Sequence, residues 1–243
     1  MEDWEVKLIR EIELKNLAPS TKKAYLARIY RLVKFYDKHP KDITFEEIKI
    51  FLHHFKNEKP LGRKTGKRAP NTVNGAASAI LFFYHKVFGR NYSGEMPRMK
   101  SAKHQPIVLS RDEVKRMIEG LENLLWKAVV MIIYSTGMRQ SEARNLKIHD
   151  IDSKRMVIYI RNSKGAKDRQ AKLYPNVLEC LRAYWQKYRI EKNSHVQSDY
   201  LFIPNKNSYN GNLSKSLSHT AVGYIVSKAA KVAGIKKKFI LTA

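Results

Sequence analysis

Residues 135–146, "STGMRQSEARNL", place an arginine just beyond an apolar segment. That segment, "LLWKAVVMIIY" over residues 124–134, is one of the most apolar runs in the chain. Gly137 is typical of a helix C-terminal stop, so a second, short helix is expected from Arg139 to Asn145. Two interpretations are open here. The joint either carries an ordinary surface arginine, or it holds a positive charge rigidly at a reactive site, with the carboxylate of Glu142 nearby.

The composition points to a polyanionic partner. Of 243 residues, 43% are hydrophobic, 47 are Lys or Arg and 22 are Asp or Glu, which gives a net charge of +25. Nucleic acid is the first partner to consider, and an acidic membrane surface is the second. No apolar run approaches the roughly 18 residues of a spanning helix, and the N-terminus lacks a signal-peptide core, so we expect no membrane. The lone cysteine, Cys180, favours a reducing compartment, the cytoplasm.

Residues 1–95 are predicted to form a four-helix domain. Apolar residues recur at helical spacing over 2–16, 18–39, 45–56 and 69–89. The third helix opens with a capping box, "TFEE", residues 44–47. The fourth contains "GAASA", residues 75–79, which is small enough for close approach to another helix or to a ligand.

A cationic loop, "KNEKPLGRKTGKRAP", joins the third and fourth helices over residues 56–70. Its charge, followed by a helix with a small face, suits a phosphate backbone. The alternative is a solvated basic loop, and the charge of the whole chain favours nucleic acid. The residues predicted to contact DNA across the chain are Lys22, Lys23, Arg28, Arg63, Lys64, Lys67, Arg68, Asn71, Thr72, Asn74, Lys167 and Arg169.

Residues 96–109 are predicted to be an extended linker, and residues 110–243 a second domain. Ser110 and Glu113 form another capping box, and helices are expected at about 111–120 and 122–135. The β-branched "MVIYIR", residues 156–161, then predicts a strand, and the following residues 162–174 complete a hairpin with a basic tip. Helices are expected from Pro175 onwards and again before Gly234. The predicted fold class is mainly α with a small β-sheet.

These motifs together resemble a known family. "YSTGMRQSEARNLKIHDID", the hairpin "SKGAKDR" and a helix ending in Ala-Gly-Ile are similar to the α+β catalytic domain of the tyrosine recombinases, the phage-integrase class. The basic helical half resembles the SAM-like core-binding domain of that family. The resemblance implies that Arg139 is the first catalytic arginine, that Glu142 is the acidic residue supporting that turn, and that Lys164 is the hairpin lysine acting near the leaving group.

The resemblance also implies a chemistry. A tyrosine attacks a DNA phosphate to give a 3′-phosphotyrosine link, without a metal or other cofactor. A guanidinium can donate in parallel to two non-bridging oxygens and stays charged, which fits Arg139. A lysine can give a proton to an alkoxide leaving group, which fits Lys164. The alternative is a surface arginine at 139 and, because Lys167 and Arg169 are close in sequence, an unspecialised basic residue at 164.

The likeness stops after the last helix. The family continues with His-x-x-Arg, another His or Trp, and then the nucleophilic Tyr, whereas here "AGIKKKFILTA" follows. We therefore expect a recombinase truncated before its nucleophile, incomplete at the C-terminus, that binds double-stranded DNA without cleaving it. The family assembles as a tetramer on DNA by exchanging C-terminal segments, and the missing segment puts that self-association in doubt. Exposed apolar surface is also expected around Ile225 and Val226.

Two other classes of function stay open. One is a non-catalytic DNA-binding regulator built on the recombinase scaffold. The other is a basic RNA-binding protein, although the sequence has no aromatic RNA-binding signature and no Gly-rich loop of the KH type. The eight histidines show no metal-ligand spacing, so no metal site is predicted.

Overall fold

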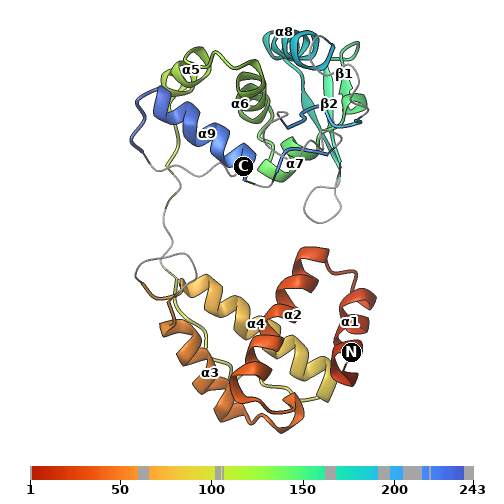
Figure 1. Ribbon diagram of the computed structural model, residues 1–243, viewed down its shortest axis with the longest axis vertical. Helices are drawn as coiled ribbons and strands as arrows, with labels where there is room; N and C mark the ends of the chain where they lie inside the picture. Colours follow the sequence, from red (N-terminus) through yellow and green to blue (C-terminus); the bar gives the residue numbers. More distant parts are fainter. Residues whose placement is uncertain are drawn as a thin grey trace. The chain divides into compact units, whose positions relative to one another are not determined.

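In a computed structural model, the chain forms two compact units, Met1–His104 (unit 1) and Gln105–Ala243 (unit 2) (Figure 1). The predicted class, mainly α with a small β-sheet, is confirmed. The described residues are 2–59, 66–101, 105, 107–161, 168–190, 198–204, 215–218 and 220–237.

Unit 1 is built around its last helix. The elements are α1 (Asp3–Leu14), α2 (Pro19–Tyr36), the 3₁₀ turn η1 (Pro40–Asp42), α3 (Phe45–Asn57) and α4 (Pro70–Phe88). Helix α4 packs against each of the other three helices. Trp4, Ile29, Ile80 and Phe83 are buried where these helices meet, and they form one apolar core. The predicted capping box at the start of α3 is present, because Thr44 and Glu47 each bond the other's backbone N–H.

The chain leaving α4 stays attached to that helix. The Asn74 side chain donates to Met99 O at 2.9 Å and accepts from Met99 N at 2.8 Å. Arg98 Nη1 donates to Ser78 Oγ at 2.8 Å, and Met96 is buried. The first residues of the predicted linker are therefore part of unit 1.

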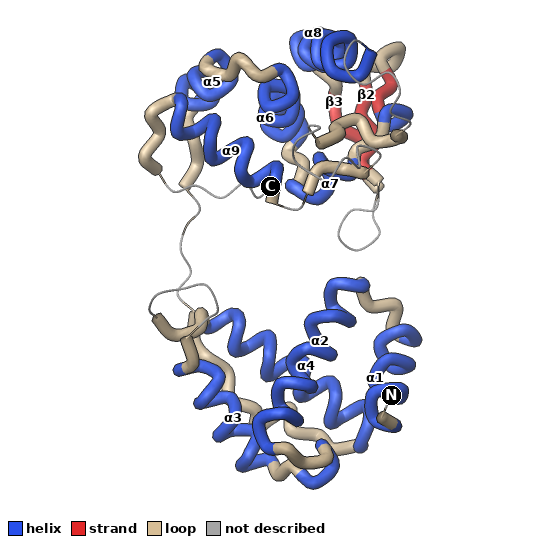
Figure 2. The backbone as a smooth tube through the Cα atoms, viewed as in Figure 1, coloured by secondary structure: helices blue, strands red, loops and turns tan. Residues whose placement is uncertain are grey.

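Unit 2 combines helices with a three-stranded antiparallel sheet, drawn in red in Figure 2. The strand order is β1-β2-β3, and the two residues of β1 were not predicted because so short a strand has no alternating pattern. The elements in chain order are α5 (Arg111–Glu119), α6 (Leu124–Thr136), α7 (Gln140–Asn145), η2 (Ile148–Asp150), β1 (Ile151–Asp152), β2 (Val157–Ile160), β3 (Arg169–Lys172), α8 (Pro175–Tyr184), the π-helical η3 (Trp185–Ile190) and α9 (Ala221–Val232).

Helix α6 is the centre of the unit 2 core. It packs against both α8 and α9, and its residues Val129, Ile132 and Ile133 are buried. A helix that is apolar on nearly every side must be enclosed by other elements, which explains the run that precedes Gly137. The expectation of exposed apolar surface at Ile225 and Val226 is wrong, because each is only 3% exposed where α9 joins this core. No helix among the described residues has the length and apolar character needed to cross a bilayer.

Candidate functional site

A fixed turn between α6 and α7 carries the arginine at position 139. Helix α6 ends at Thr136, and Gly137 adopts a left-handed conformation with φ of +62°. A residue with a Cβ takes this conformation only at a cost. The next residue, Met138, is buried in the unit 2 core. The turn is thus held on both sides, and Arg139 is the N-cap residue of α7.

Arg139 and Glu142 are bonded at two points. The Arg139 backbone N–H donates to Glu142 Oε2 at 3.0 Å, and Arg139 Nη1 donates to Glu142 Oε1 at 2.8 Å. The Glu142 side chain is 4% exposed, whereas that of Arg139 is 44% exposed. A buried carboxylate is stable only when it is paired and hydrogen-bonded. Glu142 therefore holds both ends of Arg139 while the guanidinium remains accessible from solvent.

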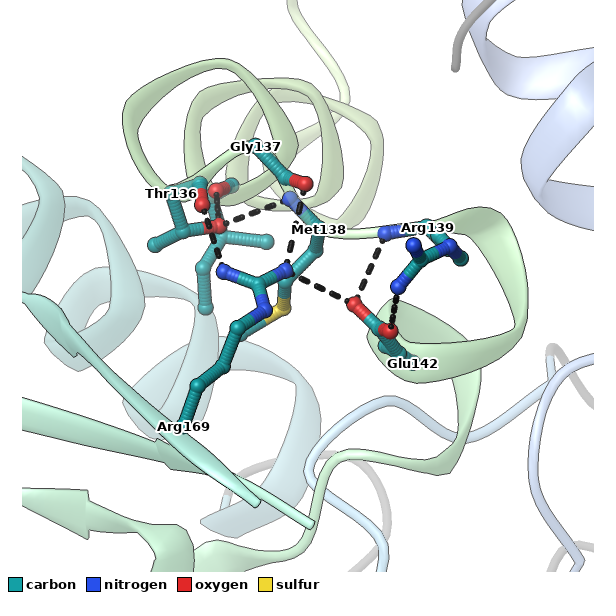
Figure 3. Close-up of polar contacts among 7 residues, drawn as sticks. Thr136, Gly137, Met138, Arg139, Glu142 and Arg169 are labelled. Carbon is teal, nitrogen blue, oxygen red and sulfur yellow. Dashed lines mark hydrogen bonds and ion pairs between the residues drawn. The ribbon is translucent and has the colours of Figure 1, made fainter. Parts of the chain in front are cut away.

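Arg169 is the third member of this cluster, as Figure 3 shows. Its Nη2 donates to Glu142 Oε2 at 2.9 Å and to Gly137 O at 3.2 Å, and its Nη1 donates to Thr136 O at 3.2 Å. The two carbonyls belong to the C-terminal end of α6, where backbone acceptors lack partners within the helix. The structure thus brings together three sequence-predicted residues, Arg139, Glu142 and Arg169.

A second buried carboxylate lies close to this cluster. Asp150 is 4% exposed, and it accepts from the Lys147 backbone N–H at 2.9 Å and from Arg161 Nε at 2.8 Å. A pocket of about 230 Å³ is lined by Glu142, Asn145, Asp150 and Arg161, among others. The wall of the pocket therefore contains two acidic side chains, Glu142 and Asp150, together with Arg161 at the end of the β-branched run.

Asp150 and Arg161 were missed by sequence reasoning, although each had a weak signal. Asp150 is an acid within "KIHDID", directly before the sheet, and Arg161 ends the β-branched run 156–161. Neither pattern shows that the two side chains pair, because eleven positions separate them and only the turn from η2 through β1 to β2 brings them together.

The basic tip of the hairpin lies outside the described residues, and with it the predicted Lys164 and Lys167. The base is described, and Ile160 of β2 pairs with Arg169 of β3. The approach of Lys164 to Arg139 therefore stays a prediction.

The residues predicted to contact DNA from α2 have different surroundings. Lys22 pairs with Glu13 at 2.7 Å, and Lys23 is exposed. Arg28 lies on α4 over Gly75, so closely that a Cβ at Gly75 would stand 2.9 Å from Arg28 Nη2. The absence of a side chain at Gly75 therefore makes room for the Arg28 guanidinium on the surface of α4.

Three residues in the first turns of α4 are predicted to contact DNA, and only two of them are exposed. Asn71 and Thr72 are exposed. Asn74 instead uses its amide to hold Met99, as described above. The Asn74 side chain thus attaches the segment after α4 to that helix, a role that its sequence position did not reveal.

The cationic loop is described only at its ends, and the predicted Arg63 and Lys64 lie outside the described residues. Lys67 is exposed, whereas the Arg68 side chain is 13% exposed. The Arg68 guanidinium lies 4.3 Å from the Phe55 ring centroid and 3.7 Å from Glu58 Oε2. In this arrangement Arg68 anchors the end of the loop, and its contact with DNA stays a prediction.

A metal site and a reactive thiol each require particular side chains and surroundings among the described residues. Within those residues, no group of three or more His, Cys, Asp or Glu side chains could hold a metal ion. Cys180 is half-buried in unit 2, and burial raises the pKa of its thiol. The charged cluster around Glu142 is thus the strongest candidate site.

Comparison with known proteins gives a consistent assignment. The sequence model of the "Phage integrase family" matches residues 108–240, and that of the "Phage integrase, N-terminal SAM-like domain" matches residues 6–94. The putative integrase/recombinase y4qK of Sinorhizobium fredii is 32% identical over 182 residues, which cover 74% of this chain and 57% of that protein. Tyrosine recombinase XerA of Thermococcus kodakarensis is 27% identical over 93% of this chain and 73% of its own.

A solved structure of lambda integrase bound to DNA has a TM-score of 0.65 at 14% identity, covering 97% of this chain and 79% of that one, which shows a shared fold. The chain spans between 53% and 57% of the length of four curated relatives. Since the first of the two sequence models covers more than half of the residues, this chain belongs to the phage integrase family.

Proposed function

We propose that the chain is the DNA-binding part of a site-specific tyrosine recombinase and that Arg139 contacts a backbone phosphate. One observation carries the proposal. The Arg139 side chain is 44% exposed, yet Arg139 is held at its backbone N–H and at its guanidinium by the carboxylate of Glu142, whose side chain is only 4% exposed. The ion pair satisfies the buried Glu142 carboxylate, and ordering the long Arg139 side chain costs entropy, so a side chain that stays this exposed once ordered is held where an anion can reach it.

The charge balance of the cluster suits an anion. Arg139 and Arg169 share one carboxylate, that of Glu142, so the three groups together keep one positive charge. A pre-aligned guanidinium donates to two oxygens of a phosphate without reorganising. The net charge of +25 adds a long-range attraction for a polyanion.

The relatives support the choice of DNA and of recombination. The Thermococcus kodakarensis relative is named a tyrosine recombinase, and structural neighbours were solved with DNA or with a recombination substrate. For the whole protein we propose strand cleavage and rejoining through a phosphotyrosine intermediate. Arg139 would stabilise the charge that develops on the attacked phosphate, and Lys164 would protonate the leaving oxygen.

We further propose that unit 1 contributes a DNA contact of its own through Arg28, Asn71 and Thr72. Arg28 has no hydrogen-bonding or ion-pair partner among the contacts of the described residues, and it lies on α4, next to the exposed first turn of that helix. Action in the cytoplasm belongs to the same proposal, on the ground that a single half-buried cysteine suits a reducing compartment.

The proposal is tested by measuring binding to duplex DNA at several salt concentrations. If six to ten phosphates are contacted, affinity should fall roughly 10³- to 10⁵-fold between 50 and 200 mM salt. Arg139→Ala should weaken binding, whereas Lys115→Ala, an equal loss of charge on α5, should have a much smaller effect. An affinity that does not change with salt concentration would contradict the proposal. So would a competition experiment in which structured RNA displaces the bound DNA more readily than unlabelled duplex DNA does.

Cleavage by the whole protein needs a separate experiment with nicked duplex substrates, which trap a covalent phosphotyrosine link. A trapped adduct supports a recombinase. Tight binding of the same DNA without an adduct would instead support a non-catalytic regulator.

A further inference from the structure

Arg169 joins three parts of unit 2 with a single guanidinium. Its Nη1 donates to Thr136 O, and its Nη2 donates to Gly137 O and to Glu142 Oε2. These acceptors belong to the end of α6, to the turn and to α7, while Arg169 itself is the first residue of β3. We propose that Arg169 is a positioning residue, which orients Arg139 through Glu142 and fixes the root of the basic hairpin to the same point. This inference rests on the proposed function.

The path from Arg169 to Arg139 runs through one atom. Glu142 Oε2 accepts from Arg169 Nη2 at 2.9 Å and also from the Arg139 backbone N–H at 3.0 Å. The other oxygen of the same carboxylate, Oε1, accepts from Arg139 Nη1 at 2.8 Å. Any rotation of the carboxylate therefore moves the acceptor of the Arg139 head group. Arg169 opposes that rotation because it is held to two backbone carbonyls that cannot move independently of α6.

The chemistry of the contacts requires an arginine. The three acceptors are met by two nitrogens of one planar group, which only a guanidinium supplies in a fixed fork. A lysine at this position could keep the charge, but its single ammonium cannot reproduce the planar arrangement. A lysine should therefore keep unit 2 folded and still leave the Glu142 carboxylate less constrained.

Arg169 also lies at the base of the β2–β3 hairpin. The Ile160–Arg169 pair is the last pair of the β2–β3 ladder before the tip. Lys164 precedes Arg169 by five positions in the sequence. A hairpin held at Arg169 has its root tied directly to the turn that carries Arg139.

The test is a double-mutant cycle on duplex DNA binding, with Arg139→Ala, Arg169→Ala and the double variant. Arg139→Ala should weaken binding roughly ten-fold and lower the salt slope by about 0.9, the value for one phosphate. Arg169→Ala should approach both effects, and the double variant should be no worse than Arg139→Ala alone. Lys172→Ala, an equal loss of charge on the same strand, serves as the matched control.

Each other outcome overturns the inference. If the effects multiply and the salt slope falls by about 1.8, Arg169 contacts a phosphate itself. If folded Arg169→Ala binds like the wild type, Arg169 serves only the stability of the fold.

A second measurement does not depend on DNA and covers the case in which the alanine variant fails to fold. In Arg169→Lys, the NMR resonances of the Arg139 guanidinium should shift and broaden relative to the wild type, whereas in Lys172→Ala they should stay in place. Unchanged resonances in Arg169→Lys would overturn the inference. Failure of the wild type to bind DNA would instead overturn the proposed function and leave this coupling intact.

Discussion

The guanidinium of Arg28 on α2 lies directly over Gly75 on α4, with no room for a side chain between them. A Cβ at position 75 would stand 2.9 Å from Arg28 Nη2 and 3.3 Å from its Cζ. Because these atoms are the far end of a flexible side chain, Arg28 would move aside rather than strain the backbone. The glycine thus decides where the Arg28 guanidinium lies.

Gly75→Ala should therefore lower DNA affinity several-fold without destabilising unit 1. Replacing a helical glycine by alanine raises helix stability by up to about 1 kcal/mol, so the melting temperature should stay constant or rise. Binding isotherms and thermal melts together check both parts. Gly94→Ala is the matched control, because nothing lies within 4 Å of a Cβ there. Equal affinity for Gly75→Ala and wild type would contradict the proposed contact of Arg28 with DNA.

Glu142→Ala should destabilise unit 2 by about 2–4 kcal/mol. Removing the carboxylate leaves two arginines without their shared partner, and breaking a buried ion pair is costly. This loss is smaller than for a fully buried pair, because both arginines are partly exposed and water can solvate their guanidinium groups once the carboxylate is gone. Urea denaturation measures the change, and Glu142→Gln, which keeps the shape and one acceptor, should lose less. A loss below about 0.5 kcal/mol in the alanine variant would argue against the structural importance of the cluster.

Gly137→Ala should destabilise the protein by about 1–2 kcal/mol, because a Cβ is unfavourable at a φ of +62°. The same substitution at Gly89, which has a φ of +68° at the end of α4, should cause a similar loss. Only Gly137→Ala is expected to weaken DNA binding by the folded protein, since only that turn carries Arg139. Calorimetry and salt-dependent binding separate the two effects. Equal binding by both variants would show that the turn tolerates displacement.

Glu47 should make unit 1 sensitive to acid. The ion pair with Lys38, together with the Thr44 backbone N–H, lowers the pKa of the Glu47 carboxyl from its ordinary value of 4.5 to about 2. The folded state therefore binds the proton less readily than the unfolded state. The resulting stabilisation is fully present above about pH 4.5 and disappears as the pH falls towards 2.

Glu47→Gln should remove this dependence. In urea denaturation at pH 3, 4, 5 and 7, the free energy of unfolding of the variant should be lower than that of the wild type at pH 7, and this difference should shrink as the pH falls. Glu46→Gln is the control, because Glu46 lies exposed on the same turn and pairs only with Lys49 among the contacts described. A constant difference between Glu47→Gln and wild type across this range would contradict the assignment.

Local signals allowed most of the fold to be predicted from the sequence. The capping boxes at Thr44 and Ser110 placed two helix starts correctly, because the bonds that form them span only three residues. The glycine at 137 likewise marked the end of α6. The two-residue strand β1 escaped prediction, since it depends on pairing with β2 rather than on its own pattern.

The candidate site was predictable only in part. The sequence motif identified Arg139 and Glu142, which are close along the chain. The pairing of Arg169 with Glu142, of Arg161 with Asp150 and of Asn74 with Met99 depends on tertiary structure, because each pair joins residues distant in sequence. The sequence gives the type of side chain at these positions but not its partner within the fold, and the predicted DNA contacts of Arg169 and Asn74 stay predictions.

The loop between α3 and α4 is closed by bonds at its two ends. The Arg68 backbone N–H donates to Lys56 O at 2.9 Å, and the Arg68 guanidinium lies on Phe55. Closing a longer loop between fixed ends costs only about 0.6 kcal/mol for each doubling of its length. Insertions and exchanges between these ends should therefore leave unit 1 folded, so the sequence between them can diverge without repacking the helices.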